Sequence, residues 1–200
     1  MGQYLLESLL IKDFFCYYLR SEIMGHIFRP FATAKSIYDI DLAFYKKMGV
    51  KVLFMDLDNT LDSYKLFHPT DKAYVLIENL INAGIRPVIV SNNRGKRVRT
   101  YATDLKVEYI NSCRKPFPGK IKRFIKNNGL KNEEVMLVGD QMMTDCVAAN
   151  LAHIRIVLTE KLVKEDQWTT HINRIFGRPI RKHQTKKGRM PDWRTIYGKD

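Results

Sequence analysis

Residues 51–60 read KVLFMDLDNT, a short apolar run that ends in two aspartates. An apolar run of this length that stops at polar residues is typical of a strand buried on both faces of a parallel sheet. Side chains alternate along a strand until it ends, so Asp56 and Asp58 can converge on one small volume just beyond it. This segment therefore predicts a buried strand with two carboxylates at its carboxyl end.

Further apolar runs follow at 85–90, 107–110, 135–138 and 154–158. Between them, the segments 70–83, 118–128 and 144–151 place apolar residues at helical spacing. Alternation of this kind predicts parallel strands joined by right-handed helical crossovers. The sequence therefore indicates an α/β fold with a central parallel sheet of about five strands. The first 50 residues look helical and apolar but carry no site motif.

Composition limits the class of protein. Among 200 residues, 45% are hydrophobic, and 34 Lys and Arg against 21 Asp and Glu give a formal charge of +13. Such a surplus attracts polyanions, namely nucleic acid, anionic lipid or phosphorylated substrates. The three cysteines form no CxxC pair, which argues against a disulfide framework and a zinc site and favours a reducing cytosol. Charged residues interrupt the apolar stretch 4–19, so neither a membrane span nor a secretory signal is predicted.

Polar residues follow the other predicted strands in a fixed order. Ser91 and Asn92 follow the second strand, Lys115 stands just ahead of a predicted helix, and Asp140 and Asp145 follow the fourth strand. The carboxyl ends of parallel strands are where open sheets bind ligands. Neighbouring carboxylates repel one another, so a divalent cation and a lysine are expected to offset their charge. One acidic pair is a weak signal, whereas this ordered set is specific.

The segments DLDNT, SNN, RKP and GDQMMTD resemble motifs one to four of the haloacid dehalogenase superfamily, and more narrowly the YqeG-type, phosphatidylglycerophosphatase-like branch of its subclass III. The segments SIYDI at 36–40 and WTTHINR at 168–174 also resemble that branch. The resemblance covers roughly residues 24 to 190. It implies a three-layer Rossmann-like fold without a large cap domain and a phosphatase domain at 24–177. Residues 178–200 are rich in Arg, Lys, Gly and Pro with few aliphatic residues, which predicts a basic, loosely ordered tail. Residues 1–23 lie outside the resemblance, so Met24 is a candidate initiator, the alternative being a dispensable extension.

The resemblance also implies the chemistry. Asp56 would be the nucleophile that forms an aspartyl phosphate, and Asp58 would protonate the leaving group and then activate water. Mg²⁺ would be held by Asp56, by the backbone carbonyl of Asp58 and by Asp140. The phosphate would be bound by Ser91, Asn92 and Lys115. Thr60, Gly139 and Asp145 would support the site, with Asp145 orienting Lys115 or lying next to the metal ligands.

Three other classes of protein are alternatives. A receiver domain also gathers acidic residues, a hydroxyl and a lysine, but its lysine comes last, whereas Asp140 follows Lys115 here. A basic protein that binds RNA or the ribosome on the same scaffold, with weak or no phosphatase activity, explains the charge equally well. A peripheral membrane scaffold is a third interpretation.

The substrate expected is a phosphomonoester. The spacing between motifs leaves no room for a lid domain, which predicts an open site for a phosphate on something large. The basic run Arg94, Lys96, Arg97 and Arg99 is interpreted either as a guide for an anionic substrate or as a solvated helix face. The candidate that the resemblance supplies is the lipid headgroup of phosphatidylglycerophosphate, which predicts a cytoplasmic protein in peripheral contact with an anionic membrane.

Overall fold

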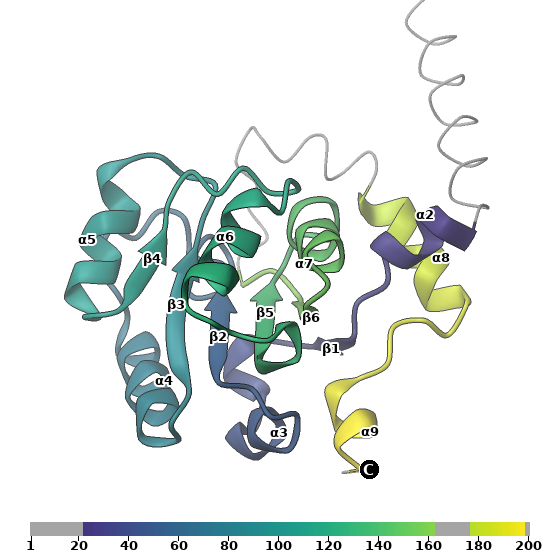
Figure 1. The fold of residues 1–200 in the computed structure, drawn as a ribbon, viewed down its shortest axis with the longest axis horizontal. Coiled ribbons are helices and arrows are strands. Elements are labelled where there is room, and N and C mark those ends of the chain that lie inside the picture. The colour runs from purple at the N-terminus through teal and green to yellow at the C-terminus, as the bar shows by residue number, and fades with distance from the viewer. Residues whose placement is uncertain (1–21, 163–176, 199–200) are drawn as a thin grey trace, which may run out of the picture.

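The computed structural model describes residues 22–162 and 177–198 of the chain. One sheet runs through it in the order β1-β6-β5-β2-β3-β4, and every pair of neighbouring strands is parallel (Figure 1). The strands are β1 (Ala32–Ala34), β2 (Val52–Met55), β3 (Arg86–Val90), β4 (Glu108–Ile110), β5 (Val135–Gly139) and β6 (Arg155–Thr159). The α/β prediction and the five predicted strands are confirmed, and β1 is a sixth strand that the sequence did not predict.

Helices cover both faces of the sheet and make it the middle of three layers. One face packs on α3 (Leu42–Lys47), α4 (Asp71–Asn82), α5 (Lys96–Asp104) and α9 (Trp193–Tyr197). The other packs on α6 (Gly119–Asn127), α7 (Val147–Ala152) and α8 (Arg178–Lys186), with Phe28 from just beyond α2 (Glu22–Ile27). The short turns are η1 (Ile37–Asp39), η2 (Asn132–Glu134) and the π-helical η3 (Met142–Cys146).

The central strand β2 shows why its sequence is continuously apolar. Leu53 and Met55 belong to the core on the α4 side, whereas Val52 and Phe54 belong to the core on the α6 side. Side chains of a strand point alternately to its two faces, so a strand covered on both faces buries every residue. All four residues of β2 are buried accordingly.

The C-terminal segment corrects an expectation. Residues 178–198 are not a loosely ordered extension, because they form α8 and α9, and Ile180 and Trp193 are buried. Trp193 packs edge-on against Phe44 of α3, with ring centroids 5.7 Å apart. The amide of Thr33 in β1 donates to the carbonyl oxygen of Pro191 over 2.8 Å. This segment therefore covers the outer edge of the sheet, although the domain limit at residue 177 stays a prediction.

In the part of the chain that the structure describes, the loops that follow the carboxyl ends of β2 and β3 contain no additional domain. Within the ranges that the structure describes, the segment from Leu57 to Thr70 and the segment from Ser91 to Lys115 contain loops, α5 and β4 but no separate lid domain. Among the same residues, none of the helices combines the length and the apolar character that crossing a membrane demands. The apolar stretch at 4–19 and the segment WTTHINR at 168–174 lie outside the described residues.

Candidate active site

Asp56 directly follows β2 in the middle of the sheet. Its amide donates to the carbonyl oxygen of Val138 in β5 over 2.9 Å, which continues the hydrogen bonding between these two strands. The chain turns immediately afterwards, since the amides of Leu61 and Asp62 both donate to the carbonyl oxygen of Leu57 and Asn59 has a φ of 65°. The connections from β2 and β5 lead in opposite directions along the sheet, the position where open sheets bind ligands. Asp56 is 6% exposed there.

Lys115 joins two of the aspartates. Its Nζ lies 2.6 Å from Oδ1 of Asp56, 2.6 Å from Oδ1 of Asp145 and 3.0 Å from the carbonyl oxygen of Val90. The side chain of Asn92 fixes the backbone of Lys115, because its Oδ1 accepts from the lysine amide over 2.7 Å and its Nδ2 donates to the lysine carbonyl over 2.8 Å. Asn92 thus uses both ends of its amide group to hold the loop that carries the lysine.

Asp140 and Asp145 approach Asp56 from the end of β5. Oxygens of the three carboxylates lie within 4.8 Å of one another, and all three residues are buried. Asp145 accepts from the amide of Gln141 through Oδ2 over 3.0 Å. Neither carboxylate oxygen of Asp140 has a hydrogen-bond partner among the described residues. Buried polar groups are rarely left without partners, so this carboxylate is suited to a cation, and the cluster indicates a metal site.

Gly139 makes this arrangement possible. A Cβ atom at position 139 would lie 2.6 Å from Cγ of Asp145 and 2.8 Å from its Cβ, which is closer than real contacts allow. A glycine at the end of β5 therefore leaves the space that the Asp145 side chain occupies where it contacts Lys115. The predicted supporting residue Thr60 is buried too, and its hydroxyl has no partner among the described residues.

Burial changes the acidity of these groups. It raises the pKa of Asp56 to about 7, with Lys115 opposing the rise and Asp145 and Asp58 adding to it. Burial, followed by the charges of Asp56 and Asp145, raises the pKa of Asp140 well above its usual range. Burial also lowers the pKa of Lys115, but Asp145 and Asp56 more than offset this, so the lysine pKa is raised. Three ionised carboxylates exceed one ammonium by two negative charges, which one divalent cation would balance.

Ser91 and Asp58 differ in burial and in their hydrogen-bond partners. Ser91 is buried at the end of β3, where its Oγ accepts from the amide of Asn93 over 3.1 Å and keeps its hydroxyl hydrogen for another acceptor. The Asp58 side chain is 20% exposed, and its Oδ1 is paired with Nη1 of Arg97. The structure thus gathers Asp56, Lys115, Asp140 and Asp145 and directs Asp58 toward α5.

Sequence reasoning missed three residues of this site. Arg97 was expected in an exposed basic run, but it is buried, whereas its neighbours Lys96 and Arg99 are exposed. Asp62 and Tyr101 were not singled out, yet the Tyr101 hydroxyl donates to Oδ2 of Asp62 over 2.6 Å inside the protein. The signal was helical spacing, because 97 and 101 are one turn apart on the face of α5 that also carries the apolar residues 98 and 102.

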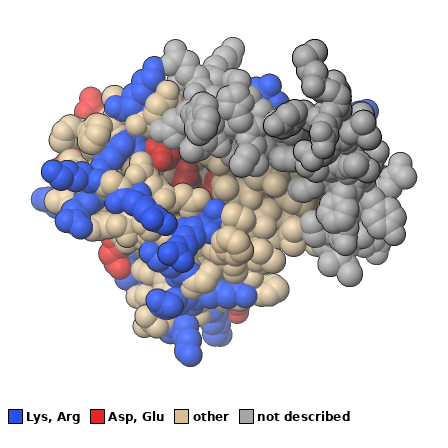
Figure 2. Space-filling view, turned by 90° about the horizontal axis from the view of Figure 1, so that it is seen from above, with Lys and Arg blue, Asp and Glu red and all other residues tan. Residues whose placement is uncertain are grey.

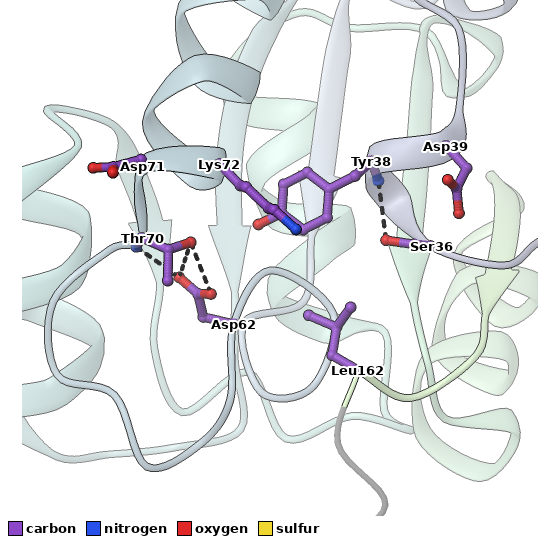
Figure 3. A pocket seen from close by; sticks show the side chains of 8 residues that line it. All are labelled: Ser36, Tyr38, Asp39, Asp62, Thr70, Asp71, Lys72 and Leu162. Carbon is purple, nitrogen blue, oxygen red and sulfur yellow. Dashed lines mark hydrogen bonds between the residues drawn. The ribbon is translucent and has the colours of Figure 1, made fainter.

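A pocket of about 620 Å³ lies where the segment after β2, the start of α4 and the turn η1 meet (Figure 3). It is lined by Ser36, Tyr38, Asp39, Asp62, Thr70, Asp71, Lys72 and Leu162. Figure 3 shows the hydrogen bonds between two of these residues, in which the Asp62 carboxylate accepts from both the amide and the hydroxyl of Thr70. None of the clustered aspartates lines this pocket, so it is not the reaction centre.

A family described as HAD-hydrolase-like matches residues 112–175, the part of the chain that carries Lys115, Asp140 and Asp145. The chain is also 31% identical over 168 residues to the "Probable phosphatase YqeG" of Bacillus subtilis (strain 168), a match that spans 84% of this chain and 98% of that protein. The chain therefore belongs to the haloacid dehalogenase superfamily of hydrolases. Its similarity to YqeG over nearly the whole of that relative places it among the phosphatases of this superfamily.

Solved structures with a similar fold are more distant. The 3-deoxy-D-manno-octulosonate 8-phosphate phosphatase of Moraxella catarrhalis, in complex with magnesium, phosphate and KDO, has 15% identity and a TM-score of 0.44, over 60% of this chain and 82% of that one. The cobalt-bound phosphatase YrbI of Haemophilus influenzae has 16% identity and a TM-score of 0.44, over 70% of this chain and 92% of that one. Both are remote likenesses of fold.

Proposed function

We propose that this protein is a magnesium-dependent phosphomonoester hydrolase that works through a phosphorylated Asp56. The observation that carries the proposal is the buried Asp56 carboxylate, held 2.6 Å from the ammonium of Lys115 beside the unpartnered oxygens of Asp140. A protein gains no stability from burying these charges together, since removing them from water is costly. Perturbed carboxylates of this kind gather at reaction centres.

Asp56 and Asp58 divide the reaction between them. An oxygen of the Asp56 carboxylate bonds to phosphorus while the ester P–O bond breaks, and Asp58 gives its proton to the leaving oxygen. Water then bonds to the same phosphorus and the Asp56–phosphorus bond breaks, with Asp58 accepting the proton of the water. Lys115 and the Ser91 hydroxyl donate to the phosphoryl oxygens, whose charge grows in the transition state. Asn92 was predicted to bind the phosphate, but both ends of its side-chain amide bond to the backbone of Lys115, so we assign it to holding the lysine loop. Thr60, Gly139 and Asp145 support the site.

Mg²⁺ would be held by Asp56, Asp140 and the backbone carbonyl of Asp58. All three offer oxygen ligands, which Mg²⁺ prefers, and the unpartnered oxygens of Asp140 fit this role. When bound, the ion would neutralise part of the charge on the transferring phosphoryl group. Asp145, already engaged by Lys115 and by the amide of Gln141, serves instead to orient the lysine.

The surface around the site favours a phosphate carried by a large anionic partner. Figure 2 looks down on the molecule from above in the sense of Figure 1, and it shows Lys and Arg side chains gathered on the side where α5 lies, with a small acidic patch near the middle. Phe117, two residues after Lys115, is 71% exposed, and Phe67 is 56% exposed. The exposed cations flanking the site motifs are Arg94, Lys96, Arg114, Lys122 and Arg123.

This combination supports a lipid headgroup as the substrate. Each basic residue near an anionic bilayer contributes about 1 kcal/mol of attraction, and apolar side chains such as Phe bury into the headgroup boundary. Phosphatidylglycerophosphate is the candidate that the family resemblance supplies. The test is Mg²⁺-dependent phosphate release from this lipid in anionic vesicles, compared with soluble phosphosugars, nucleotides and phosphopeptides, together with cosedimentation at low and high salt. Strong turnover of phosphosugars without vesicle binding would exclude the lipid and keep the phosphatase.

The high positive charge is also consistent with an alternative function, in which a protein with this fold binds RNA or a ribosomal particle. Charge alone supports it, since the chain has a formal charge of +13. A pure binder has no need of Asp58 beside a buried nucleophile, which favours the enzyme. RNA binding at physiological salt by a protein that releases no phosphate from any of these substrates would favour the alternative.

A further inference from the structure

Arg97 has an unusual position for a residue in a run of exposed cations. It lies in the first turn of α5 with only 6% of its side chain exposed. Its guanidinium donates from Nε to the carbonyl oxygen of Leu66 over 2.5 Å, from Nη2 to the carbonyl oxygen of Ser63 over 2.9 Å, and from Nη1 to Oδ1 of Asp58. One planar group thus contacts three acceptors on the segment that follows the nucleophile.

The same helix face holds that segment at a second point. Tyr101, one turn further along α5, is buried and donates its hydroxyl to Asp62 over 2.6 Å. Asp62 in turn accepts from the amide and the hydroxyl of Thr70, as drawn in Figure 3. The segment 57–70 is therefore held to α5 by Arg97 and Tyr101. Within the segment, Asp62 is also joined to Thr70, which precedes α4. Arg97 is the member of this set that reaches the Asp58 carboxylate.

The contacts of Arg97 exclude the role expected for its neighbours. A cation that guides substrates must face solvent, as Arg94, Lys96 and Arg99 do. Arg97 instead directs its donors inward, and each nitrogen type has an acceptor. A guanidinium presents five N–H donors in a fixed plane, so its orientation is set by the two carbonyls, and the carboxylate that it pairs with is oriented in turn. A lysine carries its three N–H donors on one nitrogen, so it cannot reach three acceptors that contact three different nitrogens of the guanidinium plane.

We propose that Arg97 is a positioning residue for Asp58, holding its carboxylate where it exchanges a proton with the leaving oxygen and then with water. The proposal rests on the proposed phosphatase function and adds to it a residue outside the four motifs. Asp56 would still attack phosphorus without Arg97, because none of the Arg97 hydrogen bonds involves Asp56. The loss should therefore fall on the proton that Asp58 gives to the leaving oxygen.

The experiment uses two soluble substrates that differ in their need for that proton. Nitrophenyl phosphate releases a stable phenolate, whereas an alkyl phosphate must have its leaving oxygen protonated. Arg97→Met is compared with wild type by kcat/KM, which reports the steps up to phosphorylation of Asp56. We expect kcat/KM for the alkyl phosphate to fall by about 100-fold, in the range of general acid catalysis, and that for nitrophenyl phosphate by less than about threefold.

Three further variants separate positioning from charge and from folding. Arg97→Lys keeps the charge without the planar group, so it should also lose most of its activity on the alkyl phosphate. This variant still tests the proposal if Arg97→Met does not fold. Arg99→Met removes the same charge from the exposed side of α5 and should keep the wild-type ratio of the two kcat/KM values. Tyr101→Phe removes the hydroxyl that bonds to Asp62 and should lower the unfolding temperature while keeping that ratio.

The outcomes are distinct. Equal losses on both substrates in the Arg97 variants, or a wild-type ratio in Arg97→Lys, would overturn the positioning role and leave the phosphatase intact. A wild-type protein that hydrolyses neither substrate in the presence of Mg²⁺ would overturn both proposals together. A selective loss of alkyl phosphate turnover in both Arg97 variants, with Arg99→Met unaffected, is the result that supports the proposal.

Discussion

The ammonium of Lys115 donates to Oδ1 of Asp56 over 2.6 Å at a place where only 2% of the lysine side chain and 8% of the aspartate side chain are exposed. Opposite charges enclosed together interact strongly, but their removal from water costs free energy that the attraction only partly offsets. The burial of the Lys115–Asp56 pair is therefore better explained by a role in catalysis than by a gain in the stability of the fold. It has structural consequences nonetheless, because Lys115 also neutralises Asp145.

Lys115→Met is expected to remove both activity and stability. Without the ammonium, Asp56 and Asp145 are buried next to each other without a counter-charge, a change that typically costs about 3–5 kcal/mol. Phosphate release should fall at least about 100-fold, as when one donor to a developing charge is removed. Denaturant unfolding and steady-state kinetics measure the two effects. Lys126→Met, which removes an exposed lysine from α6, is the control, and equal effects of the two substitutions would contradict the assignment.

Asp140→Asn is expected to separate metal binding from folding. The carboxylate is buried with no partner for either oxygen, so replacing it by a neutral amide should leave the metal-free protein at least as stable as wild type. Magnesium at about 100 times its Kd stabilises a protein by ~2.7 kcal/mol, and this gain should disappear in the variant. Thermal unfolding with and without Mg²⁺ makes the comparison. An undiminished Mg²⁺ effect in Asp140→Asn would place the ion elsewhere.

The raised pKa of Asp56 predicts a pH dependence of the metal-free protein. Burial raises the pKa of this group from 3.8 to about 7, so between these values the folded state binds more protons than the unfolded state. The stabilising contribution of the neutral form is then complete below about pH 4 and is lost as the pH rises through 7. Other carboxylates titrate as well, so the quantity to measure is the difference in unfolding free energy between wild type and Asp56→Asn. That difference should shift in favour of the variant from pH 4 to pH 8, and a flat difference would contradict the account.

Gly139→Ala should displace the side chain of Asp145 and thereby disturb the active site. The added methyl group would lie 2.6 Å from Cγ of Asp145, and overpacking a buried position costs about 1–3 kcal/mol. Because Asp145 holds Lys115, phosphate release should fall together with stability. Gly119→Ala is the matched control, since a methyl group there meets no atom within 4 Å. Full activity in Gly139→Ala would show that the position of Asp145 is not needed.

Much of the sheet could be predicted because strands that are buried on both faces have continuously apolar sequences. The run 51–55 forms β2, and the runs 135–138 and 154–158 form β5 and β6. Strand β1 could not be found in this way. Its sequence Ala-Thr-Ala is short and only moderately apolar, and its hydrogen bonds come from β6 and from Pro191, far away along the chain.

The same contrast holds for the site. The order of Asp56, Ser91, Lys115 and Asp140 along the chain predicts that they meet, since all four follow parallel strands of one sheet. Arg97 shares its sequence neighbourhood with exposed cations, and only the carbonyls of Ser63 and Leu66 give it a buried place. Trp193 is buried in a segment rich in Lys and Arg for a similar reason, because Phe44 covers it. Contacts distant in sequence leave little local signal.

The measurement that tests the central claim most directly is the location of the phosphoryl group after rapid acid quenching of Asp58→Asn with nitrophenyl phosphate and Mg²⁺. This variant lacks the base that activates water, so the intermediate should accumulate. Mass spectrometry of its peptides is expected to find one phosphoryl group on Asp56, and the double variant with Asp56→Asn is expected to carry none. A protein that releases phosphate at the wild-type rate when Asp56 is replaced by Asn, with no phosphoryl group on residue 56 of Asp58→Asn, would contradict the account.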